Sequence, residues 1–94
     1  MQDGFEEFLR GQKQTGGGIL SRLSRANRAE GIVGNLDAVA SDDEKMYKAL
    51  LLLKEEEQKT GDHNNLQNAV RKYYQYRNGH EFPKLKDYER MTGR

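Results

Sequence analysis

The sequence SDDEKMYKALLLLKEEEQKTG, residues 41–61, contains the clearest helix signal in the chain. Ser41, with Glu44 three positions later, is the pattern of a capping box, in which two side chains satisfy free amide groups of the first turn. Acidic side chains in that turn are also favoured by the helix dipole. Gly61 is a typical terminator because glycine easily adopts the left-handed conformation. We therefore expect a helix over residues 42–59. Its buried positions should be Met46, Ala49, Leu50 and Leu53.

Two amphipathic segments precede this helix. The spacing of apolar residues predicts a first helix near residues 4–12 and a second near 18–33, which ends at Gly34 or frays from Gly31. Residues 14–18 should form a flexible connection between them, because each glycine costs about 1 kcal/mol in a helix relative to alanine. The expected inward positions are Phe5, Phe8 and Leu9 in the first helix, and Ile19, Leu20, Leu23 and Ala26 in the second.

A fourth helix is expected between Asp62, which is a suitable cap, and the exit Asn78-Gly79. Apolar residues at helical spacing define its inward face. Two further aromatic residues, Tyr74 and Tyr76, fit either the core or a surface contact. The residues predicted to face inward are Leu66, Ala69, Val70 and Tyr73.

These elements predict an all-α fold, a compact bundle of four or five helices in one domain over residues 1–94. Hydrophobic residues make up 34% of the chain and charged residues 33%, so the core should be thin. The ordered core should cover about residues 4–82, with a connector over 35–40 that tucks its apolar side chains inward. Residues 83–94 should form a tail with a last helical turn or two over 84–91.

Few residues in the chain are suited to catalysis or metal binding. There is no cysteine, and the two histidines, His63 and His80, lie far apart in expected loops. No serine or threonine has a base at a suggestive spacing. Glu55, Glu56 and Glu57 should point in three directions on a helix, which indicates a solvated face. No apolar run approaches the roughly 18 residues that span a bilayer. We therefore expect a cytoplasmic protein that is not an enzyme and has no cofactor, no metal and no membrane contact.

Charge is unevenly distributed, although the net charge is only +1. Residues 35–62 contain four basic and eight acidic side chains, whereas residues 63–94 contain seven basic and three acidic ones. Two helical sequences, SRLSRANR (21–28) and NAVRKYYQYR (68–77), place basic residues beside neutral hydrogen-bond donors. That mixture is typical of phosphate contacts on DNA, although arginine stripes also occur on ordinary solvated helices. The candidate DNA-binding residues are Arg22, Arg25, Arg28, Arg71, Lys72 and Arg77.

The order of these elements resembles the core-binding domain of tyrosine recombinases of the phage-integrase type. The sequence LQNAVRKYYQYRNG (66–79) is similar to the final helix of that domain, and SRLSRANRAEGIVGNL (21–36) is similar to its second helix. The resemblance covers residues 5–79. It implies a SAM-like bundle that clamps one side of double-stranded DNA, with the second and fourth helices facing the phosphates.

Two features depart from that family. Its catalytic domain, with a nucleophilic tyrosine, cannot fit in 94 residues, so strand cleavage is not expected. The chain would then be one domain of a longer protein or a stand-alone relative. The usual serine or threonine cluster before the second helix is replaced by Thr15 and Gly16-Gly17-Gly18. Those amides could contact one phosphate at a helix terminus, with a simple flexible linker as the alternative. A nucleotide-binding loop would need a lysine and a hydroxyl that are missing here.

A protein-interaction module is the rival hypothesis, because helical bundles of one fold serve unrelated functions. Its interface would be the acidic third predicted helix, over residues 42–59, together with the exposed leucines Leu51 and Leu52. Binding to duplex DNA should weaken steeply with salt. Binding to a protein partner through leucines should depend on those leucines instead.

Overall fold

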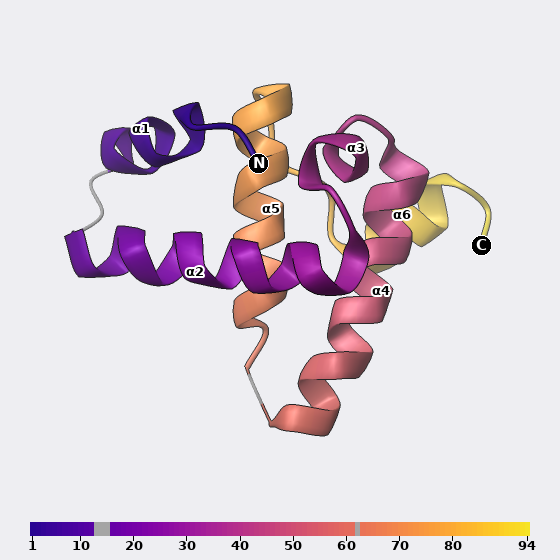
Figure 1. Cartoon of the computed structure of the whole chain (residues 1–94). Coiled ribbons are helices and arrows are strands. Elements are labelled where there is room, and N and C mark those ends of the chain that lie inside the picture. The colour runs from indigo at the N-terminus through magenta and orange to yellow at the C-terminus, as the bar shows by residue number, and fades with distance from the viewer. Residues whose placement is uncertain (13–15, 62) are drawn as a thin grey trace.

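The computed structural model describes residues 1–12, 16–61 and 63–94. All regular structure in these residues is helical, which confirms the predicted all-α class. This described part contains six helices (Figure 1), where four or five were predicted. They are α1 (Gly4–Gly11), α2 (Gly16–Val33), α3 (Leu36–Ala40), α4 (Asp43–Thr60), α5 (Asn65–Asn78) and α6 (Leu85–Met91).

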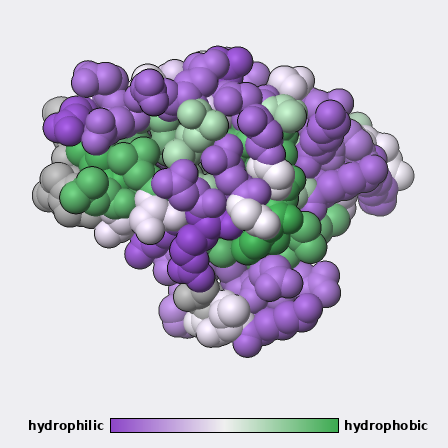
Figure 2. All heavy atoms as spheres, viewed as in Figure 1, coloured by the Kyte–Doolittle hydropathy of each residue, from purple (hydrophilic) through white to green (hydrophobic). Residues whose placement is uncertain are grey.

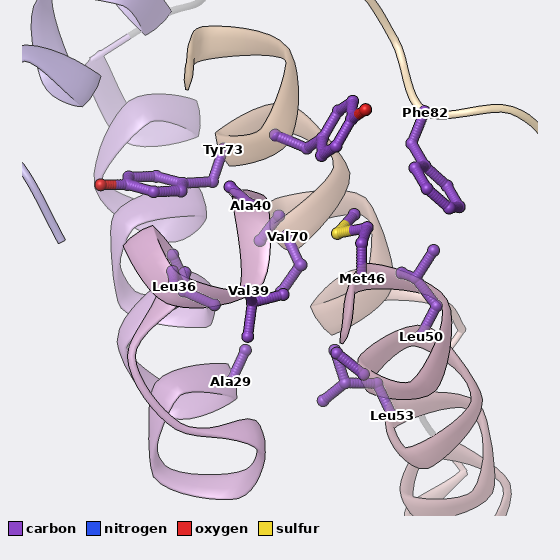
Figure 3. Packing of buried hydrophobic residues seen from close by; sticks show 14 of the residues in the cluster. Ala29, Leu36, Val39, Ala40, Met46, Leu50, Leu53, Val70, Tyr73 and Phe82 are labelled. Atoms are coloured by element: carbon purple, nitrogen blue, oxygen red, sulfur yellow. The ribbon is translucent and has the colours of Figure 1, made fainter. Parts of the chain in front are cut away.

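Helices α2 and α5 form the centre of the bundle. Figure 1 shows α2 lying across α5, and these two helices make the most extensive contact among the described elements. Helix α1 covers one end of α2, while α3 packs on α4 and α5. The hydrophobic core lies between these helices, as the close view in Figure 3 shows. Fully buried side chains in it include Leu36, Met46, Leu50, Leu53, Val70 and Tyr73.

The helix predicted over residues 42–59 is confirmed as α4, but its cap is one residue later than expected. The carboxylate of Asp42 accepts hydrogen bonds from the amides of Glu44, at 2.8 Å, and Lys45, at 3.1 Å. Ser41 was the wrong choice because the expected connector over residues 35–40 is itself helical. Ser41 ends that short helix, and its hydroxyl donates to the carbonyl of Ala38 at 2.8 Å.

Helix α2 begins at Gly16, so the prediction of a flexible connection over residues 14–18 is wrong for its last three residues. Residues 14 and 15 lie outside the described part of the chain. Each glycine costs about 1 kcal/mol in a helix, and packing of the rest of the helix on the core can offset that cost. The buried side chain of Ile19 then anchors that turn on the core.

The inward face of α2 differs from the prediction at one position. Leu20 is 66% exposed, whereas Ile19, Ala26 and Ala29 are buried and Leu23 is partly buried. Positions 19, 26 and 29 lie on one face of a helix with 3.6 residues per turn, and residue 20 falls beside that face. The two small alanines of this face, Ala26 and Ala29, are fully buried, and Ala29 lies beside Val39 of α3 (Figure 3).

Helix α5 begins without a side-chain cap of its own. Asn64 precedes it with a φ of 61°, and Asp62, the predicted cap, lies outside the described residues. The carboxylate of Glu57 replaces the cap, because it accepts hydrogen bonds from the amides of Leu66, at 3.0 Å, and Gln67, at 3.2 Å. Glu57 is only 2% exposed, so the prediction of a solvated carboxylate is wrong here.

The tyrosines and the carboxyl-terminal segment complete the core. Tyr73 is fully buried as predicted, Tyr74 is buried as well, and Tyr76 is partly buried against Phe5. The segment after Gly79, expected as a tail, folds back so that α6 adds Tyr88 to the interior. The five tyrosines are therefore mainly core residues.

Candidate nucleic-acid interface

The crossing of α2 and α5 brings three of the predicted basic residues together. Arg22 of α2 and Arg71 and Lys72 of α5 line one surface pocket of about 260 Å³. The Nη1 atom of Arg22 lies 3.5 Å from the carbonyl oxygen of Asn68, which is also on α5. The two helices thus share a single basic surface, which we call the α2/α5 pocket. Its remaining lining residues are Asn68, Gln75, Glu81 and Phe82.

Arg71 is held in place by the turn that follows α5. Its Nη1 atom donates to the carbonyl oxygens of Phe82, at 3.0 Å, and Pro83, at 3.1 Å. Its guanidinium carbon lies 5.9 Å from the centre of the Phe82 ring. Burial lowers the pKa of Arg71, and the charge of Glu81 offsets this effect only in part. Arg71 therefore supports the turn and also contributes a fixed positive charge to the pocket.

Lys72 and Arg22 keep their charge available to a ligand. The Lys72 ammonium donates to the neutral side-chain oxygens of Gln12, at 2.6 Å, and Gln75, at 3.2 Å. Burial lowers the pKa of Arg22, and the positive charge of Arg25 lowers it further, so these two cations lie close together on α2. Within the described residues, no carboxylate lies at ion-pair distance from Arg22, Arg71 or Lys72.

Three predicted residues, Arg25, Arg28 and Arg77, do not line this pocket. Arg77 points to the other side of α5, where its Nε lies 3.4 Å from the carboxylate of Asp37 and its Nη1 donates to Gln2 at 2.9 Å. Arg28 is exposed on α2, three residues beyond Arg25, and is not among the residues that line the pocket. The structure thus brings together Arg22, Arg71 and Lys72, with Arg25 beside them.

Asn68 and Gln75 belong to the sequence 68–77, whose neutral hydrogen-bond donors were noted, but they were not among the candidate DNA-binding residues. Asn68 and Gln75 lie on the same face of α5 as Arg71 and Lys72, because positions 68, 71, 72 and 75 repeat at three and four residues. That spacing is visible in the sequence and would have identified a polar stripe. Glu81 could not be found in this way, because it approaches the pocket only through the turn after α5.

The acidic end of α4 does not neutralise the pocket. Glu55 and Glu56 both pair with Lys59, at 3.8 and 3.7 Å, and the buried carboxylate of Glu57 is used by the amides that begin α5. Among the residues that the structure describes, Glu81 is the one carboxylate that lines the pocket. Three cations against a single anion leave the pocket with an excess of positive charge.

The part of the chain that the structure describes contains no group of three or more potential metal ligands. Its helices include none with the length and hydrophobicity of a membrane span. Comparisons of the chain with protein-family models, with curated proteins and with solved structures find no match. The recombinase resemblance therefore remains a prediction from sequence patterns.

Proposed function

We propose that the chain binds double-stranded DNA through the phosphates, using the surface formed by Arg22, Arg25, Arg71 and Lys72. The observation that supports this most directly is the convergence of Arg22 with Arg71 and Lys72 in one pocket, where no carboxylate of the described chain lies at ion-pair distance from them. Arginine and lysine side chains donate hydrogen bonds to the phosphate oxygens of DNA, and amide side chains such as those of Asn68 and Gln75 add neutral donors.

The tyrosines favour a double strand over a single strand as the ligand. Proteins that bind single strands stack the bases on exposed aromatic rings. Here four of the five tyrosines are buried, and the fifth, Tyr76, packs in tilted contact with Phe5 and Phe8. The basic surface thus has charge and hydrogen-bond donors to offer, which suits a regular phosphate backbone.

Salt dependence measures the number of phosphate contacts. Each phosphate that a protein neutralises on duplex DNA lowers the logarithm of the binding constant by about 0.9 per logarithmic unit of salt. If all four cations contact phosphates, the slope should be about −3 to −4. A fluorescence-anisotropy titration with a labelled duplex of about 20 base pairs, repeated at several salt concentrations, gives this slope directly.

A matched pair of double variants tests the location. Arg22→Glu with Lys72→Glu should weaken binding by at least about tenfold and reduce the slope by about two. Lys54→Glu with Lys86→Glu changes exposed lysines of α4 and α6, outside the pocket, and should have little effect. Each double variant lowers the net charge by four, from +1 to −3, so overall charge cannot explain a difference. Absence of binding by the unmodified chain at low salt would overturn the proposal, and equal losses in both variants would overturn the location.

A further inference from the structure

A second hollow in the surface lies where the end of α2 meets α3 and α4. Its volume is about 380 Å³, and the buried side chains of Val39 and Ala49 contribute to its lining. Ile32 and Leu52 also line it, yet they are 37% and 41% exposed. Figure 2 shows hydrophobic surface on this side of the molecule, where the end of α2 approaches α4. We call this feature the α2/α4 groove.

The exposed face of α4 that borders the groove has opposite charges at its two ends. Lys45 and Lys48 line the groove seven and four residues before Leu52. Glu55 and Glu56 follow Leu52 by three and four residues, which places them on the same side of the helix. Leu52 thus lies between a basic half and an acidic half of one helix face.

The remaining charges preserve this asymmetry. Lys59 pairs with both Glu55 and Glu56, so the acidic half has a net charge of −1. Near the basic half, the carboxylate of Glu44 is paired with Arg94. Within the described residues, neither Lys45 nor Lys48 forms an ion pair.

We propose that the α2/α4 groove is the contact between two copies of this chain, related by a twofold axis close to Leu52. A twofold axis makes the same patch face itself, so every contact occurs twice. An axis perpendicular to α4 aligns the two α4 helices in opposite directions, which sets Lys48 of one copy opposite Glu56 of the other. A parallel alignment would instead place lysines against lysines.

The apolar residues fit the same arrangement. Leu52 and Ile32 stand at the groove of their own copy, so the twofold axis brings them over the groove of the other copy. Their burial on association would remove from water the side chains that are exposed in the single chain. This contact is independent of the α2/α5 pocket, because the two features have no lining residue in common.

Sedimentation velocity of the whole chain over about 10 µM to 1 mM tests the contact. A small interface between two copies should have a dimer dissociation constant within this concentration range. A monomer-to-dimer transition is expected. Lys48→Glu should raise the dimer dissociation constant at least about tenfold, because it sets two carboxylates opposite one another. Glu56→Lys alone should have a similar effect.

Combining the two changes provides the decisive comparison. The double variant Lys48→Glu with Glu56→Lys re-creates the opposite charges with their positions exchanged. Its dimer dissociation constant should return to within about threefold of that of the unmodified chain. Lys54→Glu, on another face of α4, is the matched control and should leave the dimer intact. Circular dichroism would show that each variant is folded. A chain that stays monomeric throughout the range, or a double variant that fails to recover, would overturn the proposal.

Discussion

Glu57 accepts a hydrogen bond from the backbone amide of Leu66 at 3.0 Å, although nine positions separate the two residues. The last turn of α4 thereby caps the first turn of α5. The other oxygen of the same carboxylate binds the amide and the side chain of Gln67, each at 3.2 Å. A buried carboxylate of this kind is stabilised only while all of its donors are in place.

The first prediction concerns this carboxylate. Glu57→Gln should lower the free energy of unfolding by about 1–3 kcal/mol, because an amide group then faces the donors of Gln67. Urea denaturation followed by circular dichroism measures the change. Glu55→Gln, an exposed position on the same helix, is the control and should change stability by less than about 0.5 kcal/mol. Equal effects at both positions would contradict the capping role.

Substitution by alanine should have opposite effects on stability at Gly4 and at Gly31. A β-carbon on Gly4 would overlap the hydroxyl of Tyr76 and lie 3.2 Å from its ring carbon Cζ. Because the Tyr76 ring is packed against Phe5 and Phe8, it cannot move freely, and Gly4→Ala should destabilise the fold by about 1–3 kcal/mol. At Gly31 nothing lies within 4 Å of the added carbon, so Gly31→Ala should stabilise α2 by about 0.5–1 kcal/mol. Thermal unfolding of the two variants checks both signs.

Stability at high pH should depend on Tyr74. Burial, and then its hydrogen bond to Asp43, raise the pKa of Tyr74 from 10.0 to about 12. Below pH 10 the phenol is protonated in both the folded and the unfolded chain, so stability is unaffected there. Between pH 10 and 12 only the unfolded chain loses this proton, and the free energy of unfolding should fall as pH rises. The urea midpoint of Tyr74→Phe should fall less steeply over that interval, and an unchanged slope would contradict this assignment.

Arg22 and Arg71 should differ in their contribution to the stability of the fold. Arg71→Ala removes the donor that holds the carbonyls of Phe82 and Pro83, so it should cost about 1–3 kcal/mol of stability. Arg22→Ala removes only a contact of 3.5 Å at the surface and should leave urea denaturation nearly unchanged. Both changes should weaken binding to the DNA duplex if the proposed function is right. Equal stability of the two variants would show that the turn does not need Arg71.

Local signals in the sequence were enough to predict most of the helices. The end of α4 at Gly61 and of α5 at Gly79 follow from left-handed glycines, whose φ values are 79° and 77°. The buried positions of α4 follow from spacing alone. Helix α3 was missed because five residues are too few to show a period. Its cap, Asn35, binds the amides of Asp37 and Ala38, and that pattern is hard to distinguish from an ordinary turn.

The site could be predicted only in part. Arg71 and Lys72 were identified from composition, but their approach to Arg22 depends on how α2 crosses α5, which no local pattern specifies. Arg77 was grouped with them because it shares their helix. Six positions correspond to about 600° of rotation, or 240° beyond a full turn, so helix geometry itself separates Arg77 from Arg71. Glu57 could not be recognised, because its partners arrive only after the chain has reversed direction.

Because its tyrosines lie mainly in the core, the intrinsic fluorescence of the chain should report on unfolding. With five tyrosines and no tryptophan, its intrinsic fluorescence arises from rings that are almost all enclosed by other side chains. Those rings change surroundings when the helices separate, whereas a duplex seated on the outer surface of α2 and α5 would leave them as they are. Emission near the tyrosine maximum can therefore follow unfolding while a dye on the duplex follows association, both in the same sample.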